Sequence, residues 1–262
     1  MLNKRYSVMV FLDIETVPLY PSLENMKDSN LTLYKLWDTK YHSNRADVSP
    51  EQFYLEEAGI HAAVSRVACI GIGRLYSPQG QESSWEEEIL SDLDEKKLLE
   101  TFSKKWREIL GGTDKALLCG HNIRNFDLPF IGRRLLINKL PLLPFWIDLM
   151  QNPNSKTYSS DISIADTMQM WKFGSYGSRF VSLEELATLL GLTFKKQLDH
   201  HEIRKRFYDW FENKDRESFK EVEKYCLMDV RVVAWCYLAM MATDSTDVGI
   251  NQKLQSKIPI TP

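Results

Sequence analysis

Cysteine is scarce in this chain, and none of its cysteines forms a C-x-x-C pair. Each one lies in an apolar run, which is typical of a buried free thiol in a reducing compartment. We therefore expect neither a disulfide framework nor a cysteine-based zinc site. The His200-His201 pair lacks a partner at ligand spacing and is expected at a surface helix start. The four cysteines are Cys69, Cys119, Cys226 and Cys236.

Long apolar runs are also missing. No stretch reaches the ~18 apolar residues that a membrane-spanning helix needs. The segment Met1–Tyr6 is too short and polar for a signal peptide, and the apolar run that follows it stops at Asp13. We expect no membrane association and a cytoplasmic location.

The chain lacks the strong positive charge of proteins that coat duplex DNA, since its net charge is −3 and its pI is about 6.0. A local basic groove remains compatible with an acidic total. The apolar content of 44% and the charged content of 26% are ordinary for a soluble globular protein. A length of 262 residues fits one large domain.

The periodicity of apolar residues predicts alternating strands and helices, and hence an α/β domain with a mixed five-stranded sheet and helices on both faces. We expect this single domain over residues 1–242, with a helical, aromatic-rich insertion at about 20–60 and a flexible tail at 243–262. The expected strands are Tyr6–Ile14, Arg66–Leu75, Ser84–Leu90, Ala116–Cys119 and Ile162–Asp166. The expected helices outside the insertion are Glu95–Leu110, Phe126–Asn138 (with Arg133 and Arg134 on its polar side), Leu183–Leu190, Glu202–Glu212 and Ser218–Met240.

Two carboxylates stand at the end of the first expected strand, in the segment Asp13-Ile14-Glu15-Thr16-Val17. Residues two apart in a strand point to the same face, so Asp13 and Glu15 lie side by side. Like charges this close repel, and a hard cation such as Mg²⁺ between them removes that cost. Taken alone, the pair fits an ordinary solvated strand end better than half of a metal site.

Two further segments carry acidic residues in defined local settings. Asp127 lies in the first turn of a predicted helix, which follows the strand Ala116–Cys119 and a turn, and the helix dipole favours an acid there. Tyr225 and Asp229 are four residues apart in a predicted helix and so share one face. Each segment by itself also fits an ordinary helix terminus or an amphipathic helix.

Together the three segments resemble the DEDD (DnaQ-like) 3′–5′ exonucleases of the subclass with tyrosine in the third motif. Asp13 and Glu15 match the first motif, D-x-E. The residues from Asn122 to Asp127 match the second motif, N-x2–3-(F/Y)-D, and Tyr225 with Asp229 matches the third, Y-x3-D.

The resemblance is specific to this subclass. The sibling subclass has histidine five residues before the last aspartate, where this chain has Lys224. The segment G-H-N-I-R-N-F-D-L-P-F-I, at residues 120–131, is most similar to the proofreading domain of family B DNA polymerases. The resemblance implies a ribonuclease-H-like fold, in agreement with the predicted order of elements.

The resemblance also implies roles for the acidic residues. Asp13 would bridge two Mg²⁺ or Mn²⁺ ions, with Glu15 and Asp229 completing the shell of the first ion and Asp127 holding the second. Tyr225 would orient the attacking water, since a phenol with a pKa near ~10 is a poor base at neutral pH.

Substrate contacts are implied for three more residues. Thr16 would contact the terminal nucleotide, Asn122 would approach the scissile end, and Phe126 would either wedge or simply pack. The implied function is a metal-dependent exonuclease acting on single-stranded or frayed DNA 3′ ends. An exoribonuclease would use the same motifs, and a silent binding module would usually have lost one of the four carboxylates.

The segment Asp166–Phe180 interleaves aromatic rings with cations, which suits stacking on unpaired bases and holding phosphates. It also fits a loop that covers the core with its rings facing inward. Asp166 matches no catalytic motif, and we interpret it as structural. The aromatic and cationic residues of the segment are Trp171, Lys172, Phe173, Tyr176, Arg179 and Phe180.

Overall fold

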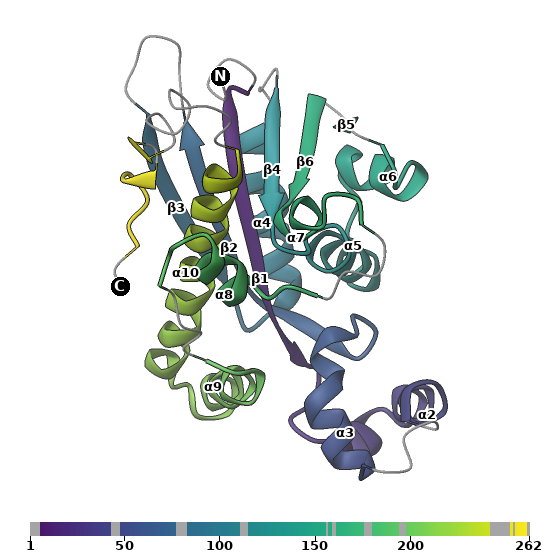
Figure 1. The fold of residues 1–262 in the computed structure, drawn as a ribbon. Coiled ribbons are helices and arrows are strands. Elements are labelled where there is room, and N and C mark those ends of the chain that lie inside the picture. Colours follow the sequence, from purple (N-terminus) through teal and green to yellow (C-terminus); the bar gives the residue numbers. More distant parts are fainter. Residues whose placement is uncertain are drawn as a thin grey trace.

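A mixed sheet of six strands forms the centre of the computed structural model, in the order β3-β2-β1-β4-β6-β5 (Figure 1). The structure describes residues 6–42, 48–76, 83–110, 115–155, 157–158, 161–175, 180–193, 198–241, 252–253 and 255–260. The strands are β1 (Val8–Pro18), β2 (Ser65–Tyr76), β3 (Ser84–Ser91), β4 (Ala116–Gly120), β5 (Thr157–Tyr158) and β6 (Ile162–Asp166).

Helices cover the faces of this sheet. In the described part of the chain, no helix is long and apolar enough to cross a membrane. The insertion contains α1 (Leu23–Ser29), α2 (Leu31–Trp37), the π-helix η2 (Asp38–His42), α3 (Pro50–Glu57) and the 3-10 turn η3 (Ala58–Ile60). The remaining helices are α4 (Glu95–Leu110), α5 (Asp127–Ile137), α6 (Pro144–Gln151), α7 (Thr167–Trp171), α8 (Leu183–Leu189), α9 (His200–Asn213) and α10 (Arg216–Met240).

The strand pairing confirms the expected mixed α/β sheet. β1 pairs antiparallel with β2 and parallel with β4, and β6 runs parallel to β4 on the other side. The five expected strands are present, but the strand count was wrong, because the two residues of β5 add a sixth strand at the edge. Two residues are too few to show an alternating pattern, so periodicity does not reveal such a strand.

Side-chain alternation along β1 divides the core into two layers. Val10 and Leu12 pack in the cluster that contains residues of α4 and α5. Met9 and Phe11 pack on the opposite face, against α10. Figure 1 shows α10 crossing one face of the sheet, with α4 lying behind the other. Asp13 continues the row of Met9 and Phe11 and therefore belongs to the face that α10 covers.

A glycine opposite Asp13 allows α10 to approach the sheet closely. Gly71 of β2 is the register partner of Asp13. A Cβ atom at Gly71 would lie 2.9 Å from Cγ2 of Val230 and 3.0 Å from Sγ of Cys226, both on α10. Because such contacts are shorter than van der Waals separation, a larger residue here would displace the helix.

The insertion packs around its own aromatic cluster, with Trp37 and Tyr54 fully buried between the short helices. The four cysteines are free and buried, as expected. The expected start of α9 at the histidine pair is confirmed, since Asp199 caps this helix immediately before His200. Within the expected tail, Ile258 is buried against the cluster of α10, and Gln255 Nε2 donates a hydrogen bond to Trp235 O at 3.1 Å.

A buried ion pair locks α4 and α5 to the start of β2. Nη2 of Arg134 donates to Glu95 Oε2 at 2.5 Å, and Nη1 donates to Ala62 O at 2.8 Å. Glu95 Oε1 also accepts from the main-chain N of Val67 at 2.8 Å. The expectation of a polar-face Arg134 was wrong, whereas Arg133 is exposed. Neighbouring helical residues point about 100° apart, so adjacent arginines can face different environments.

Arg134→Met is expected to lower the free energy of unfolding by about 3–5 kcal/mol, because Glu95 would remain buried without its cation. Arg133→Met, at the exposed neighbouring position, should change stability by no more than about 0.5 kcal/mol. Urea denaturation of both variants measures the difference. Equal stabilities would show that the buried pair does not hold these elements together.

Candidate active site

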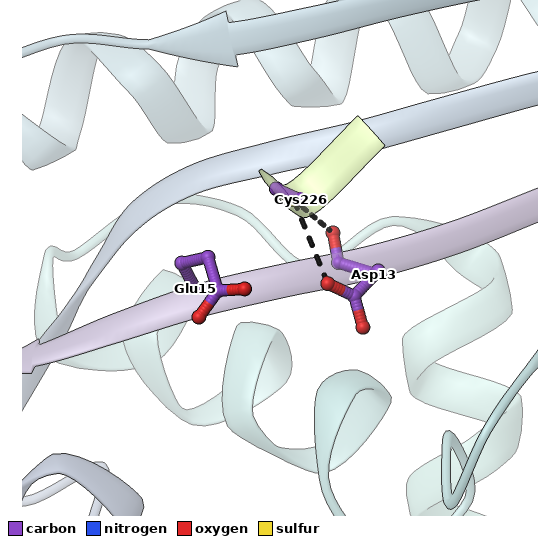
Figure 2. A group of neighbouring side chains, drawn as sticks. All are labelled: Asp13, Glu15 and Cys226. Atoms are coloured by element: carbon purple, nitrogen blue, oxygen red, sulfur yellow. Dashed lines mark hydrogen bonds between the residues drawn. The ribbon is translucent and has the colours of Figure 1, made fainter. Parts of the chain in front are cut away.

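Three ligand-type atoms converge where β1 passes under α10. One carboxylate oxygen of Asp13, one of Glu15 and the Sγ of Cys226 lie within 4.8 Å of one another (Figure 2). Sγ of Cys226 is 3.6 Å from both the main-chain O and Oδ2 of Asp13. From sequence, Cys226 is interpreted only as a buried thiol. Its position next to Tyr225 of the third motif is the sequence signal that could have placed Cys226 beside the site.

A β-bulge follows the two acids. Glu15 pairs with Cys69, but Thr16 pairs with Val67, so β2 contains one extra residue at this point. Bulges twist a strand and change the direction of neighbouring side chains. Beyond the bulge, the hydroxyl of Thr16 donates to Gly59 O at 2.8 Å and ties the strand to the insertion. Substrate contact by Thr16 stays a prediction.

Asp127 joins the site from the first turn of α5. Its side chain is buried, and Oδ1 accepts a hydrogen bond from the main-chain N of Ile14 at 3.2 Å. Ile14 lies between the two acids of β1, so this bond fixes the second motif against the first. The two residues are 113 positions apart in the chain.

Asp166 holds the turn that precedes α5. Its carboxylate accepts from the main-chain N atoms of Asn122 at 3.1 Å and Arg124 at 3.2 Å. It also caps α7 by accepting from the N atoms of Met168 and Gln169. The structural interpretation of Asp166 is therefore confirmed.

The other two residues with expected substrate contacts lie in this turn. Asn122 adopts a left-handed backbone with φ of 59°, and its Oδ1 accepts from Nδ2 of Asn125 at 3.0 Å. The Phe126 ring is partly buried and packs on Phe130, with centroids 5.5 Å apart. Its position fits packing, and the roles of both residues toward substrate stay predictions.

The third motif lies on the face of α10 that meets β1. Burial, together with the charges of Asp229 and Glu15, raises the pKa of Tyr225 well above its ordinary value of 10. Burial also raises the pKa of Asp13, with further contributions from Asp229, Glu15 and Asp127. The charges that act on Asp13 and Tyr225 therefore come from three distant segments of the chain.

The donor chemistry of this cluster fits hard divalent cations, which prefer carboxylate oxygens. Asp13 and Glu15 supply such oxygens at short mutual distance. Because the charges of Asp229, Glu15 and Asp127 raise the pKa of Asp13, a bound cation would relieve this repulsion. The buried tyrosine, which stays protonated at neutral pH, offers a hydroxyl rather than a charge.

The chain belongs to the RNase H superfamily, because the model of that superfamily matches residues 52–240. The ribonuclease-H-like fold is thereby confirmed. The matched segment includes Asp127, Tyr225 and Asp229, whereas Asp13 and Glu15 precede it.

Among characterised proteins, the chain is similar to the DNA polymerase delta catalytic subunit of Plasmodium falciparum (isolate K1 / Thailand). The two are 29% identical over 157 residues, which cover 52% of this chain and 13% of the polymerase subunit. The chain thus spans a small part of this relative's length. The superfamily match and this relative support the resemblance to the DnaQ-like 3′–5′ exonucleases.

Matches among solved structures include the family B DNA polymerase from the hyperthermophilic archaeon Pyrobaculum calidifontis. That match has a TM-score of 0.47 and 13% identity, and it covers 97% of this chain and 27% of the polymerase chain. Another is E. coli Exonuclease I in complex with a 5cy-dA13 oligonucleotide, with a TM-score of 0.36 and 13% identity over 71% of this chain and 36% of that chain.

Asp127→Asn is expected to flatten the pH dependence of stability of the metal-free protein. Burial raises the pKa of Asp127 from its ordinary value of 3.8 to about 7 in the folded state. In the wild-type protein this contribution to stability is fully present below about pH 4 and is lost as the pH rises toward 7. The loss is on the order of a few kcal/mol.

Urea denaturation in EDTA across this pH range measures the effect. Asparagine retains an oxygen that accepts from Ile14, so the local hydrogen bond is preserved. Asp28→Asn, at an exposed position on α1, is the matched control and should follow the wild-type curve. Parallel curves for wild type and Asp127→Asn would contradict the assigned shift.

Proposed function

We propose that this protein is a metal-dependent 3′–5′ exonuclease that hydrolyses phosphodiester bonds of DNA. The observation that carries the proposal is the convergence of Asp13, Glu15, Asp127, Tyr225 and Asp229 on one site. These residues match the three DnaQ-like motifs in chain order. The similarity to a DNA polymerase catalytic subunit supports DNA as the substrate class.

Two Mg²⁺ or Mn²⁺ ions are the proposed cofactors, and when bound they supply charge relief at the phosphate and a more acidic attacking water. Asp13 would contribute to both ions. Glu15 and Asp229 would complete one shell, and Asp127 would hold the second ion. The four negative charges of the carboxylates offset the four positive charges of two divalent ions.

Tyr225 would position the attacking water through its hydroxyl. Its raised pKa excludes a phenolate as general base at neutral pH, because the proton is held tightly. Thr16 and Asn122 would contact the terminal nucleotide near the site, and Phe126 would support that end of the strand. The substrate would be a single-stranded or frayed 3′ end, and we propose a cytoplasmic location in keeping with four free buried thiols.

A DNA strand labelled at its 5′ end is expected to yield a descending ladder with Mg²⁺ or Mn²⁺, and no products in excess EDTA. The ladder follows from removal of single nucleotides at the 3′ end, and the metal requirement follows from the all-oxygen carboxylate set. RNA of the same sequence tests the exoribonuclease alternative. Rapid cleavage of a closed circular single strand, or full activity in EDTA, would refute the assignment.

Asp13→Ala is expected to abolish turnover, whereas Tyr225→Phe should retain a measurable fraction. Loss of one preorganised electrostatic group typically costs about 10²–10³ in rate, and Asp13 is assigned to both ions. Tyr225→Phe removes one hydroxyl and keeps the buried ring, so the packing of α10 persists.

The measurement is kcat at saturating Mg²⁺, with melting temperatures in EDTA as the folding control. Asp28→Ala, an exposed acid on α1, should behave as wild type. Near wild-type turnover in Asp13→Ala would exclude its bridging role. A folded Tyr225→Phe as inactive as Asp13→Ala would show that the tyrosine does more than orient water.

A further inference from the structure

Exposed aromatic rings gather on one short segment beside the candidate active site. Trp171 at the end of α7 is 36% exposed, Phe173 is 91% exposed and Phe180, just before α8, is 66% exposed. Among the described residues, one other phenylalanine or tryptophan is exposed. It is Phe211 on α9, with an exposed fraction of 45%. Single exposed rings are common on protein surfaces, but three exposed rings within ten residues of sequence indicate an interaction surface.

The rings of Phe173 and Phe180 do not cover the core. The inward-facing alternative for this segment is therefore wrong for these two residues. Apolar rings left in water forgo the gain from burial. Tyr176 and Arg179 of the same segment lie outside the described residues.

The backbone presents Phe173 outward in an unfavourable conformation. Its φ is 47°, in the left-handed region where a bulky non-glycine residue is an outlier. The turn is closed by hydrogen bonds from Phe173 N to Met170 O at 3.1 Å and from Ser175 N to Lys172 O at 2.8 Å. Strain of this kind tends to occur at ligand-binding sites, where the surrounding structure maintains it.

Phe180 is fastened to the turn that carries the second motif. Its ring lies edge-on to His121, with centroids 6.4 Å apart. Nε2 of His121 lies 2.9 Å from Val181 O, and Nδ1 lies 2.9 Å from Oγ1 of Thr167, the first residue of α7. His121 directly precedes Asn122 in the chain, so the segment is tied at this end to the candidate site.

We propose that Phe180 and Phe173 form a stacking platform for unpaired bases of the DNA strand whose 3′ end occupies the carboxylate site. The proposal rests on the exonuclease function proposed above. Stacking suits an enzyme that removes successive nucleotides, because every base has a π-face and the contact tolerates any sequence. Lys172, between the two exposed rings Trp171 and Phe173, adds a cation suited to the phosphate backbone.

A nucleic-acid strand fits this segment better than a protein partner does. The segment is tied to the turn of the candidate site through His121, and its rings alternate with polar residues and a cation in sequence. A protein interface would instead place its apolar residues in one contiguous, well-packed patch. The occupant assigned here is therefore a base-bearing single strand.

The test is binding of a fluorescent oligothymidylate to the full chain in EDTA, where no hydrolysis is expected. Phe180→Ala and Phe173→Ala should each raise Kd roughly 5- to 150-fold, the range expected for loss of one stacked base. Phe180→Trp should restore binding. Phe211→Ala, which removes an exposed ring on α9, is the matched control and should stay within about two-fold of wild type.

A strand with abasic sites in place of its bases provides the decisive comparison. Wild type and Phe180→Ala should bind that strand equally, because the ring then has nothing to stack on. Unchanged Kd values for both variants on oligothymidylate would overturn the proposal. A loss that persists on the abasic strand, or failure of the wild type to bind oligothymidylate, would also overturn it.

Hydrolysis of the same oligothymidylate with Mg²⁺ separates this proposal from the proposed function. If the wild type degrades the strand and the alanine variants bind it normally, only the stacking platform is refuted. If the wild type degrades no strand with Mg²⁺ or Mn²⁺, the exonuclease assignment is refuted whatever the binding data show.

Discussion

Repulsion among partly buried carboxylates is the constraint on which the arrangement of this protein depends. Asp13, Glu15, Asp127 and Asp229 gather at one point of the sheet, where burial and like charges raise the pKa of Asp13. Without a cation or a proton, such a cluster favours separation of the elements that carry it. The surrounding structure must therefore hold β1, α5 and α10 together against this repulsion.

Apolar packing supplies most of that resistance. β1 lies between β2 and β4 and is covered on one face by α4 and α5 and on the other by α10. Gly71, opposite Asp13, removes a side chain where α10 must come close. The helix can then bring Tyr225 and Asp229 to the same face of β1 without loosening the core.

Hydrogen bonds from buried polar groups also hold the second motif in place. Asp166 accepts from main-chain N atoms on both the motif turn and α7, and Asp127 accepts from Ile14. The Arg134–Glu95 pair anchors α5 further along its length. Because these groups are paired and desolvated, their geometry is rigid. The exposed aromatic segment after α7 begins from this rigid base, so an adaptable binding surface is attached to a fixed chemical centre.

Local patterns in the sequence were enough to predict most helices and strands and to propose the members of the site. Alternation placed Asp13 and Glu15 on one face of a strand, and a four-residue spacing placed Tyr225 and Asp229 on one face of a helix. The expected bounds of α4 and β6 agree with the structure, because both segments have regular apolar patterns. The resemblance to the second motif then placed Asp127 in the same proposed set.

The partner that each helix or strand face contacts follows from the packing of distant segments. Periodicity reports the direction of a side chain but not its partner, and Cys226 contacts Asp13 across 213 positions of sequence. For the same reason the pattern did not reveal that Arg134 is buried against Glu95 or that Phe173 and Phe180 face solvent. Short elements such as β5 and α7 take their shape from neighbours, because a few residues have too little local preference to define a strand or helix alone.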